Sequence, residues 1–413
     1  MSKLYHILEF CQVLAQYFPF INTLATISPR FSSPHKRANT VAKYSLLCYN
    51  IPMKIKRLEL QNFRNYEHQI VEFSDGLNVL IGKNAQGKTN LVEAINFCCI
   101  GKSHRTSKER ELINFEKEKA KIKVVCEKCA GEKTVEVLLS KVDKKIIRIN
   151  GMSILRIGEL FGNINAVFFS PDDLKLVKES PVDRRKFLDI DLSQMSKVYF
   201  YNLLRYEKIL AQRNKLLKDS FDKTIARSGL DVWNEQLAQV GAKIIFARHN
   251  FTCNLNTIAH DIHARLTDNA ENLQISYTGF DGENIDEVYR KLHSSLQSAT
   301  EKDLSLGYTT VGPHRDDLKI VCNGIDLRSY GSQGQQRTTA LSLKLAELEI
   351  FKDEIGEYPI LILDDVLSEL DDARCNKLLS NISNVQTILT GTSFAYPYKS
   401  TKFTIQNGKI IQN

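Results

Sequence analysis

Three short motifs suited to phosphate follow one another along this 413-residue chain, and their order is the strongest constraint on its fold. The first, Gly82–Thr89, has the pattern GxxxxGK[ST] of a phosphate-binding loop. The second, Ser332–Gln335, opens a helical run, and the third is the apolar run Ile360–Leu363 followed by Asp364 and Asp365. One such motif can arise by chance, whereas all three in this order predict a nucleotide-binding α/β fold.

The first motif has the context that phosphate binding needs. The apolar run Leu77–Ile81 before it predicts a buried strand, and Asn90–Phe97 after it has helical spacing. Loop N–H groups, the helix start and the Lys88 ammonium would face phosphate oxygens, while the Thr89 hydroxyl would ligate Mg²⁺. An ordinary glycine turn is the alternative. The predicted ATP-binding residues are Gly82, Lys83, Asn84, Ala85, Gln86, Gly87, Lys88 and Thr89.

The two carboxylates after Ile360–Leu363 predict the catalytic part of the site. Burying two acids at a strand end is costly unless a cation compensates their charge. We expect Asp364 to hold Mg²⁺, and Asp365 to orient or deprotonate the attacking water. Asp365 and Lys88 are therefore the predicted catalytic residues. A helix-capping aspartate beside a solvated neighbour is the alternative, and the phosphate-binding loop favours the catalytic interpretation.

The middle motif predicts how the site is completed. Ser332, Gly334 and Gln335 precede the helical run Ala340–Phe351, and such a helix start is a second anion site. One chain does not need two γ-phosphate sites, so we expect each subunit to complete the pocket of the other in a two-fold, ATP-dependent homodimer. An ordinary capped helix is the alternative. Together the motifs predict an ABC-type P-loop ATPase head.

From Met53 onward the chain resembles the RecF family, bacterial recombination-mediator ATPases related to SMC proteins. The segment Ile55–Tyr66 resembles the first hairpin of that family. Further matching segments are Asn90–Ile95, Lys102–Arg105, Phe169–Leu174, Arg184–Asp189 and Gly312–Leu318. The last two are the most specific, because they distinguish RecF from transporters and from SMC proteins.

The resemblance implies an ATP-dependent DNA-binding protein of recombinational repair and replication, with a part in the SOS response. It implies binding to duplex DNA and gap junctions, a weak DNA-stimulated ATPase that acts as a switch, and loading of RecA filaments with RecR and RecO. Arg64 would approach the nucleotide, Asn84 would touch the γ-phosphate and Asp371 would cross the dimer interface. No histidine follows the carboxylate pair, so Thr390 or Thr392 occupies the switch-histidine region, which agrees with slow hydrolysis.

Composition sets looser limits on function. The net charge of +8 permits contact with nucleic acid without requiring it, and residues 1–52 contribute five basic and one acidic side chain, which leaves +4 for the rest. A solvated helix face is the commoner explanation for any one basic run. The basic residues that could contact DNA are Lys144, Lys145, Arg148, Arg184, Arg185, Lys186, Lys208, Arg213, Lys215 and Lys218.

The cysteines and the N-terminal segment indicate the compartment. Nine cysteines show no disulfide or zinc framework, and Cys126 and Cys129 fall in a predicted hairpin with reduced thiols. Leu4–Ile27 is interrupted by Glu9 and Pro19, so it is a weak candidate for a membrane span. We expect a cytoplasmic, nucleoid-associated protein that does not contact the membrane.

The predicted domains follow from these motifs. Residues 1–52 are expected to be a disordered tail, or sequence translated from upstream of the true start. Residues 53–180 form the first part of the ATPase head, 181–300 an inserted α-helical arm (lobe II), and 301–413 the second part of the head. This second part is expected to end in a hairpin of the strands Phe403–Ile405 and Lys409–Ile411 around the turn Asn407-Gly408. Two alternatives stay open, a purely structural SMC-like clamp that holds DNA ends and the nucleotide-binding subunit of a membrane transporter.

Overall fold

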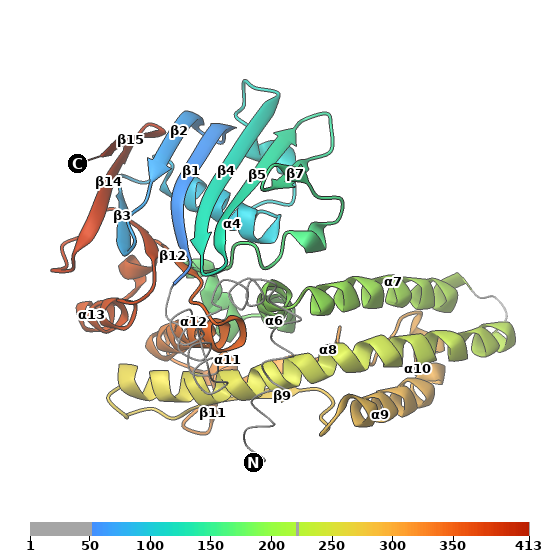
Figure 1. Cartoon of the computed structure of the whole chain (residues 1–413). Coiled ribbons are helices and arrows are strands. Elements are labelled where there is room, and N and C mark those ends of the chain that lie inside the picture. The colour runs from blue at the N-terminus through green and yellow to red at the C-terminus, as the bar shows by residue number, and fades with distance from the viewer. Residues whose placement is uncertain (1–51, 220–222, 413) are drawn as a thin grey trace, which may run out of the picture. The chain divides into compact units, whose positions relative to one another are not determined.

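The computed structural model describes residues 52–219 and 223–412 (Figure 1). Of the predicted N-terminal extension only Pro52 belongs to these residues, so the expectations for residues 1–51 lie outside the described part of the chain. Among the helices that the structure describes, none has the length and apolar character of a membrane span.

A six-stranded sheet carries the predicted nucleotide-binding motifs. Its order is β15-β14-β3-β13-β12-β8, and all its strands are parallel except β15, which pairs antiparallel with β14 at the edge. The strands are β3 (Leu77–Ile81), β8 (Ala166–Phe169), β12 (Ile360–Asp364), β13 (Thr387–Gly391), β14 (Ser400–Gln406) and β15 (Lys409–Gln412). The predicted strands at Leu77–Ile81 and Ile360–Asp364 and the C-terminal hairpin are confirmed. Because β3, β12 and β13 are parallel, the loops that follow them meet at one edge.

A second sheet of six strands is antiparallel, in the order β2-β1-β4-β5-β6-β7. Its strands are β1 (Lys54–Phe63), β2 (Tyr66–Glu72), β4 (Lys119–Lys128), β5 (Gly131–Ser140), β6 (Ile146–Ile149) and β7 (Met152–Ser153). Alternate residues of β4 are buried, as expected for a strand with one face on a core. The predicted hairpin around Cys126 and Cys129 is confirmed as β4–β5, with Cys126 buried and Cys129 exposed at the turn.

The inserted arm is built on two long helices that pack side by side, α7 (Lys197–Asp219) and α8 (Lys223–Leu266) (Figure 1). A small antiparallel sheet in the order β11-β10-β9 packs on α8. The other elements are α6 (Pro181–Met195), β9 (Leu273–Thr278), α9 (Ile285–Ser298), α10 (Thr300–Leu306), β10 (Asp317–Cys322), β11 (Ile325–Asp326) and α11 (Leu327–Tyr330). Because β9 pairs with β10, this sheet extends across the boundary predicted at residue 300.

Two apolar cores cover the two faces of the parallel sheet. Successive side chains of β12 point to opposite faces of the sheet. Ile360 and Ile362 lie in a first core with α4 (Lys88–Ile100) and the antiparallel sheet, whereas Leu361 and Leu363 lie in a second core with the arm. Helix α12 (Gln333–Ile355) lies in the second core against α8. The remaining helices are α5 (Lys175–Lys178) and α13 (Asp372–Asn381), with 3₁₀ turns at Glu109–Leu112, Ile157–Glu159, Pro171–Leu174 and Val366–Glu369.

Candidate nucleotide-binding site

The predicted phosphate-binding loop connects the end of β3 to the start of α4. The Lys88 ammonium folds back over this loop and donates hydrogen bonds to the carbonyl oxygens of Gly82 (2.6 Å) and Lys83 (2.9 Å). Burial lowers the pKa of Lys88, while the charges of Asp365 and Asp364 act in the opposite direction. The predicted cation and the two predicted acids therefore share one electrostatic environment.

The β1–β2 hairpin holds the end of the loop in shape. Gly87 has a φ of 115°, and a Cβ on it would lie 2.6 Å from the Asn65 side-chain nitrogen and 3.0 Å from the Tyr66 hydroxyl, so a larger residue does not fit. The Tyr66 hydroxyl donates to the Gly87 carbonyl oxygen (3.0 Å), and the Asn65 amide donates to that of Gln86 (3.0 Å). Gly87 belongs to the sequence motif, but the side chains that leave no room for a larger residue there, Asn65 and Tyr66, belong to the β1–β2 hairpin.

The turn between β14 and β15 holds the same loop from the other end of the chain. The Asn407 amide N–H donates to Gln86 Oε1 (2.6 Å), and the Gly408 N–H donates to the Gln86 carbonyl oxygen (3.2 Å). Gly408 approaches closely, because a Cβ there would lie 2.4 Å from the Asn65 carbonyl oxygen. The sequence pattern indicates only a hairpin turn at Asn407-Gly408, and it gives no sign that Asn65, Tyr66 or Asn407 contacts the phosphate-binding loop.

Asp364, the predicted Mg²⁺ ligand, ends a strand that is buried along its whole length. Its Oδ1 accepts hydrogen bonds from the hydroxyls of Thr89 (3.2 Å) and Thr390 (2.7 Å). Burial raises the pKa of Asp364, and these two hydrogen bonds only partly offset it. The Thr89 hydroxyl and the Asp364 carboxylate are hard oxygen donors of the type that Mg²⁺ prefers, and a bound cation would offset the burial of the charge. This donor set fits the predicted ion.

Asp365 follows in the left-handed backbone region, with a φ of 55°. Its amide N–H donates to the Thr390 hydroxyl (3.0 Å), so this one hydroxyl accepts from Asp365 and donates to Asp364. Thr390 is buried at the end of β13, whereas Thr392, the other residue predicted for the switch position, is exposed. Of the two threonines, Thr390 is thus the one that positions both acids.

Arg64, predicted to approach the nucleotide, is anchored on the helix that follows the loop. Its guanidinium makes two hydrogen bonds to the buried Glu93 carboxylate (3.0 and 2.8 Å) and a third to the Glu111 carbonyl oxygen (2.9 Å). Burial would raise the pKa of Glu93, but hydrogen bonds from Arg64 and Ser103 and the charges of Arg64 and Arg105 lower it overall. Ser103 and Arg105 of the RecF-like segment Lys102–Arg105 thus contact the same Glu93 carboxylate as Arg64. Contact of Arg64 with a nucleotide stays a prediction.

His104 lies next to the same edge of the sheet, and no motif in the sequence predicts it as a site residue. Its ring packs against that of Phe168 on β8, with the ring centres 4.3 Å apart. Burial lowers the pKa of His104, although the charges of Glu93 and Asp364 act in the opposite direction. His104 is therefore a neutral imidazole near the predicted Mg²⁺ ligand at neutral pH.

The predicted signature motif begins α12. The exposed Ser332 caps the helix, because its hydroxyl accepts from the Gln335 amide N–H (3.2 Å) while its own N–H donates to Gln335 Oε1 (3.1 Å). Asp371 caps α13 in a similar way, accepting from the Arg374 N–H (2.8 Å). The capping geometry is present, and contact of Ser332, Gly334 or Asp371 with a second subunit stays a prediction.

The RecF-like segments Arg184–Asp189 and Gly312–Leu318 meet at the base of the arm, where α6 packs against α8 and β10. Arg184 makes two hydrogen bonds to the Asp317 carboxylate (2.6 and 2.9 Å). Arg248 of α8 bonds to Asp189 (2.7 Å) and to the Pro313 carbonyl oxygen (2.6 Å). These segments therefore join α6, α8 and the start of β10 through a largely buried ion-pair network.

Some of the basic residues considered for DNA contact are used inside the protein. Arg184 is buried in the pair with Asp317, and Arg213 is fully buried, where it bonds to Asp303 (2.7 Å) and Asn234 (2.9 Å). These two arginines are not accessible to a phosphate backbone. The candidates that are exposed are Lys144, Lys186, Lys208, Lys215 and Lys218.

Comparisons with known proteins place the chain in a family and a fold. The sequence matches the family described as RecF/RecN/SMC N terminal domain over residues 54–392. The DNA replication and repair protein RecF of Clostridium tetani (strain Massachusetts / E88) is 45% identical over 372 residues, which are 87% of this chain and 100% of that protein. A solved structure of the recombination mediator protein RecF with ATP, in the RecFOR pathway, is 37% identical with a TM-score of 0.81, covering 88% of this chain and 98% of that one. The Smc head domain from Pyrococcus furiosus, at 17% identity and a TM-score of 0.53 over 87% of this chain and 96% of that one, shares the fold alone.

Proposed function

The chain belongs to the RecF family of DNA replication and repair proteins, with the fold of an ABC-type ATPase head, and on this basis we propose that it is an ATP-dependent DNA-binding protein of recombinational repair. ATP binding would close a homodimer on duplex DNA at a gap junction, and slow, DNA-stimulated hydrolysis would reopen it. The single observation that carries the nucleotide part is the convergence of Thr89 and Thr390 on Asp364 beside Lys88. Membership of the family rules out the transporter alternative.

The residues of the loop and of β12 would share the work on ATP. Lys88 would exchange its bonds to Gly82 and Lys83 for phosphate oxygens, while Thr89 and Asp364 would hold Mg²⁺. The ion would supply charge neutralisation at the β- and γ-phosphates. Asp365 would accept a proton from the attacking water, with Thr390 holding the Asp364 carboxylate and the Asp365 backbone in position. A neutral threonine cannot supply the positive charge of a switch histidine, which supports a slow ATPase.

Dimerisation is proposed from the start of α12. The first turn of a helix carries backbone N–H groups without intrahelical partners, and Ser332 keeps this turn capped and exposed. The phosphate-binding loop of the same chain would already surround the γ-phosphate. The helix start would therefore serve the nucleotide of the other subunit, in a two-fold arrangement where each chain contributes both halves.

The DNA-related part of the proposal rests on family membership. We infer binding to duplex DNA and gap junctions, with RecR as the first protein partner, and with RecO and RecA filaments as further partners. Such a protein would act at the nucleoid in the cytoplasm and take part in the SOS response. A dimer would bring the exposed lysines of both chains to one duplex and add their phosphate contacts, so DNA binding should depend on ATP.

The test substitutes Ser332 with arginine. Ser332→Arg should bind ATP as a monomer with unchanged affinity by calorimetry, yet lose ATP-dependent dimerisation by at least about tenfold in light scattering, because a bulky cation blocks the partner site. Ser329→Arg is the matched control, since it adds the same charge at an exposed serine three residues earlier and should dimerise normally. Lys88→Ala should bind ATP about 100-fold more weakly, because charge-assisted hydrogen bonds to two phosphates are lost.

Two results would contradict the proposal. A Ser332→Arg protein that still dimerises with ATP would mean that the motif only caps a helix. Filter binding to gapped, duplex and single-stranded DNA, with and without ATP, tests the second part. Equal binding to all three DNAs regardless of ATP would reject the ATP-dependent DNA switch while leaving nucleotide binding intact.

A further inference from the structure

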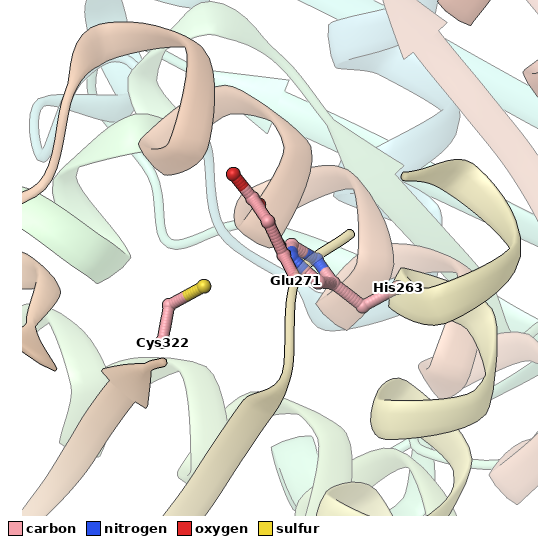
Figure 2. Close-up of side chains that lie close together, drawn as sticks. All are labelled: His263, Glu271 and Cys322. Atoms are coloured by element: carbon pink, nitrogen blue, oxygen red, sulfur yellow. The ribbon is translucent and has the colours of Figure 1, made fainter. Parts of the chain in front are cut away.

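Three side chains with metal-binding atoms meet where the arm contacts α12. They are His263 in the last turn of α8, Glu271 just before β9, and Cys322 at the end of β10, and their ligand atoms all lie within 4.8 Å of one another. Figure 2 shows the three side chains close together, each coming from a different segment. The side chain of His263 is fully buried, Cys322 is buried, and that of Glu271 is 21% exposed, which gives the cluster access to solvent.

Hydrogen bonds decide which nitrogen of His263 carries its proton. Ser342 of α12 donates its single hydroxyl proton to the Thr338 carbonyl oxygen (2.8 Å), so its oxygen must accept from His263 Nδ1–H (3.0 Å). In the neutral ring Nε2 then carries a lone pair, and it lies 3.0 Å from Glu271 Oε2. Two acceptors at this distance repel each other unless a proton or a metal cation lies between them.

We propose that His263, Glu271 and Cys322 bind a divalent metal ion of the zinc type, with a water molecule or a further ligand in a fourth position. Imidazole nitrogen, carboxylate oxygen and thiolate sulfur are together the donor set of Zn²⁺. Binding would release the thiol proton of Cys322 to solvent, and the dication would balance the thiolate and the carboxylate. The buried group would then be neutral overall, which removes the main cost of placing charges there.

The backbone around the cluster is already held together. The Asn323 N–H donates to the Asn272 carbonyl oxygen (2.9 Å), and the Asn272 N–H donates to Asn323 Oδ1 (2.8 Å), so the segments that carry Glu271 and Cys322 are joined beside the site. Tetrahedral zinc ligands with bonds of about 2.0–2.3 Å are roughly 3.5 Å apart, so the cluster must close by about 1 Å. The partly exposed Glu271 side chain can rotate to close it.

The proposed ion would join the arm to the helix that begins at Ser332. His263 and Cys322 belong to the arm, whereas Ser342, which orients the imidazole, belongs to α12. An outer partner that fixes a histidine tautomer is a regular feature of metal sites. The site therefore has a ligand set, an orienting group and a place in the fold, independent of the nucleotide site.

The test uses Co²⁺ as a spectroscopic probe of untagged, full-length protein stripped of metal with a chelator. One equivalent of Co²⁺ should give a thiolate-to-cobalt charge-transfer band with the visible bands of four-coordinate cobalt, and Zn²⁺ should displace it. Cys322→Ser should lose the charge-transfer band. Cys253→Ser is the matched control, because Cys253 lies 3.6 Å from His249 in an exposed pair that could collect metal unspecifically, and this variant should keep the band.

Ser342→Ala tests the orienting role without touching a ligand. It should keep the cobalt spectrum but bind about 10- to 100-fold more weakly, as is usual when an outer partner of a metal ligand is lost. Zn²⁺ should raise the melting temperature of the wild type but not that of Cys322→Ser. Absence of the charge-transfer band in folded wild-type protein, or its loss in Cys253→Ser but not in Cys322→Ser, would overturn the proposal and leave a hydrogen-bonded histidine–glutamate pair only.

Discussion

The nucleotide-binding edge of the parallel sheet and the base of the arm use similar charged residues in opposite ways. At the base of the arm, Arg184 is paired with Asp317 and Arg248 with Asp189, so each charge has a partner within the chain. At the nucleotide-binding edge, Lys88 bonds to backbone carbonyl oxygens and Asp364 accepts from hydroxyls. The first region pairs its charges within the chain, whereas in the second Lys88 and Asp364 are hydrogen-bonded to neutral groups, which we expect a ligand to replace.

This difference suggests a way to distinguish charged residues that stabilise the fold from those that bind a ligand. Burial shifts the pKa of Lys88 down and that of Asp364 up, so both groups are held where their charged forms are disfavoured. Mg²⁺ with ATP would supply a partner for each, which couples binding to the stability of this edge. The RecF-like segments Arg184–Asp189 and Gly312–Leu318 instead contain charged side chains that are already paired within the chain.

The largest effect is expected in the arm. Arg213→Met should lower the free energy of unfolding by about 3–5 kcal/mol, because it leaves the buried Asp303 without its cation. ATP affinity at a temperature where the variant is folded should not change. Urea unfolding measures the first quantity and calorimetry the second. The double variant Arg213→Met/Asp303→Asn should recover part of the loss, and a double variant as unstable as the sum of both single ones would show that the charges do not interact.

The next effect separates the two acids of the nucleotide-binding edge. Asp365→Asn should bind ATP and Mg²⁺ normally but hydrolyse ATP about 100-fold more slowly and accumulate as a dimer, because the proton acceptor is lost. Asp364→Asn should instead weaken Mg²⁺-dependent ATP binding by about 10- to 100-fold. Calorimetry with and without Mg²⁺, together with turnover assays, measures both. The same loss of nucleotide affinity in the two variants would show that their roles are not divided in this way.

The smallest effect concerns a buried acid that has more negative than positive neighbours. The Lys344 ammonium lies near Asp173, Glu347 and Asp191, and burial raises the pKa of Asp191 to about 7 from its ordinary value of 3.8. Because the pKa of Asp191 is higher in the folded chain than in the unfolded chain, Asp191 contributes fully to the free energy of unfolding below the unfolded-state pKa of 3.8. This contribution is lost as the pH rises toward 7. The stability of Asp191→Asn relative to the wild type should therefore be greater at pH 8 than at pH 4. Thermal unfolding at both pH values checks it, and a constant difference would exclude titration of Asp191.

Much of the fold and part of the site could be predicted from the sequence because they depend on neighbours along the chain. Buried strands, the loop between β3 and α4, the capped start of α12 and the Asn407-Gly408 hairpin all follow from local patterns. The paired acids at the end of β12 could be placed because a charged pair at a strand end is unusual. Their division into a metal ligand and a proton acceptor stays a prediction.

The contacts that complete the site could not be predicted in this way. Thr89 and Asp364 are 275 residues apart, and only the parallel register of β3, β13 and β12 brings their side chains together. The same register places Thr390 between the two acids, while Tyr66 reaches Gly87 from a hairpin of the other sheet. No local pattern distinguished Arg184, which is buried in an ion pair, from the exposed Lys186 two residues later.

The sequence by itself determined an ABC-type ATPase head, because glycine, lysine and aspartate in those motifs have few other uses, and the resemblance of further segments indicated the RecF family. Only the tertiary structure decided which charges are free to act. A side chain carries the same charge in every context of the sequence, but its pKa and its availability depend on burial and on partners that arrive from distant segments. For this reason Lys88 and Asp364 could be predicted as site residues, whereas the supporting role of Thr390 and the cluster of His263, Glu271 and Cys322 required the folded chain.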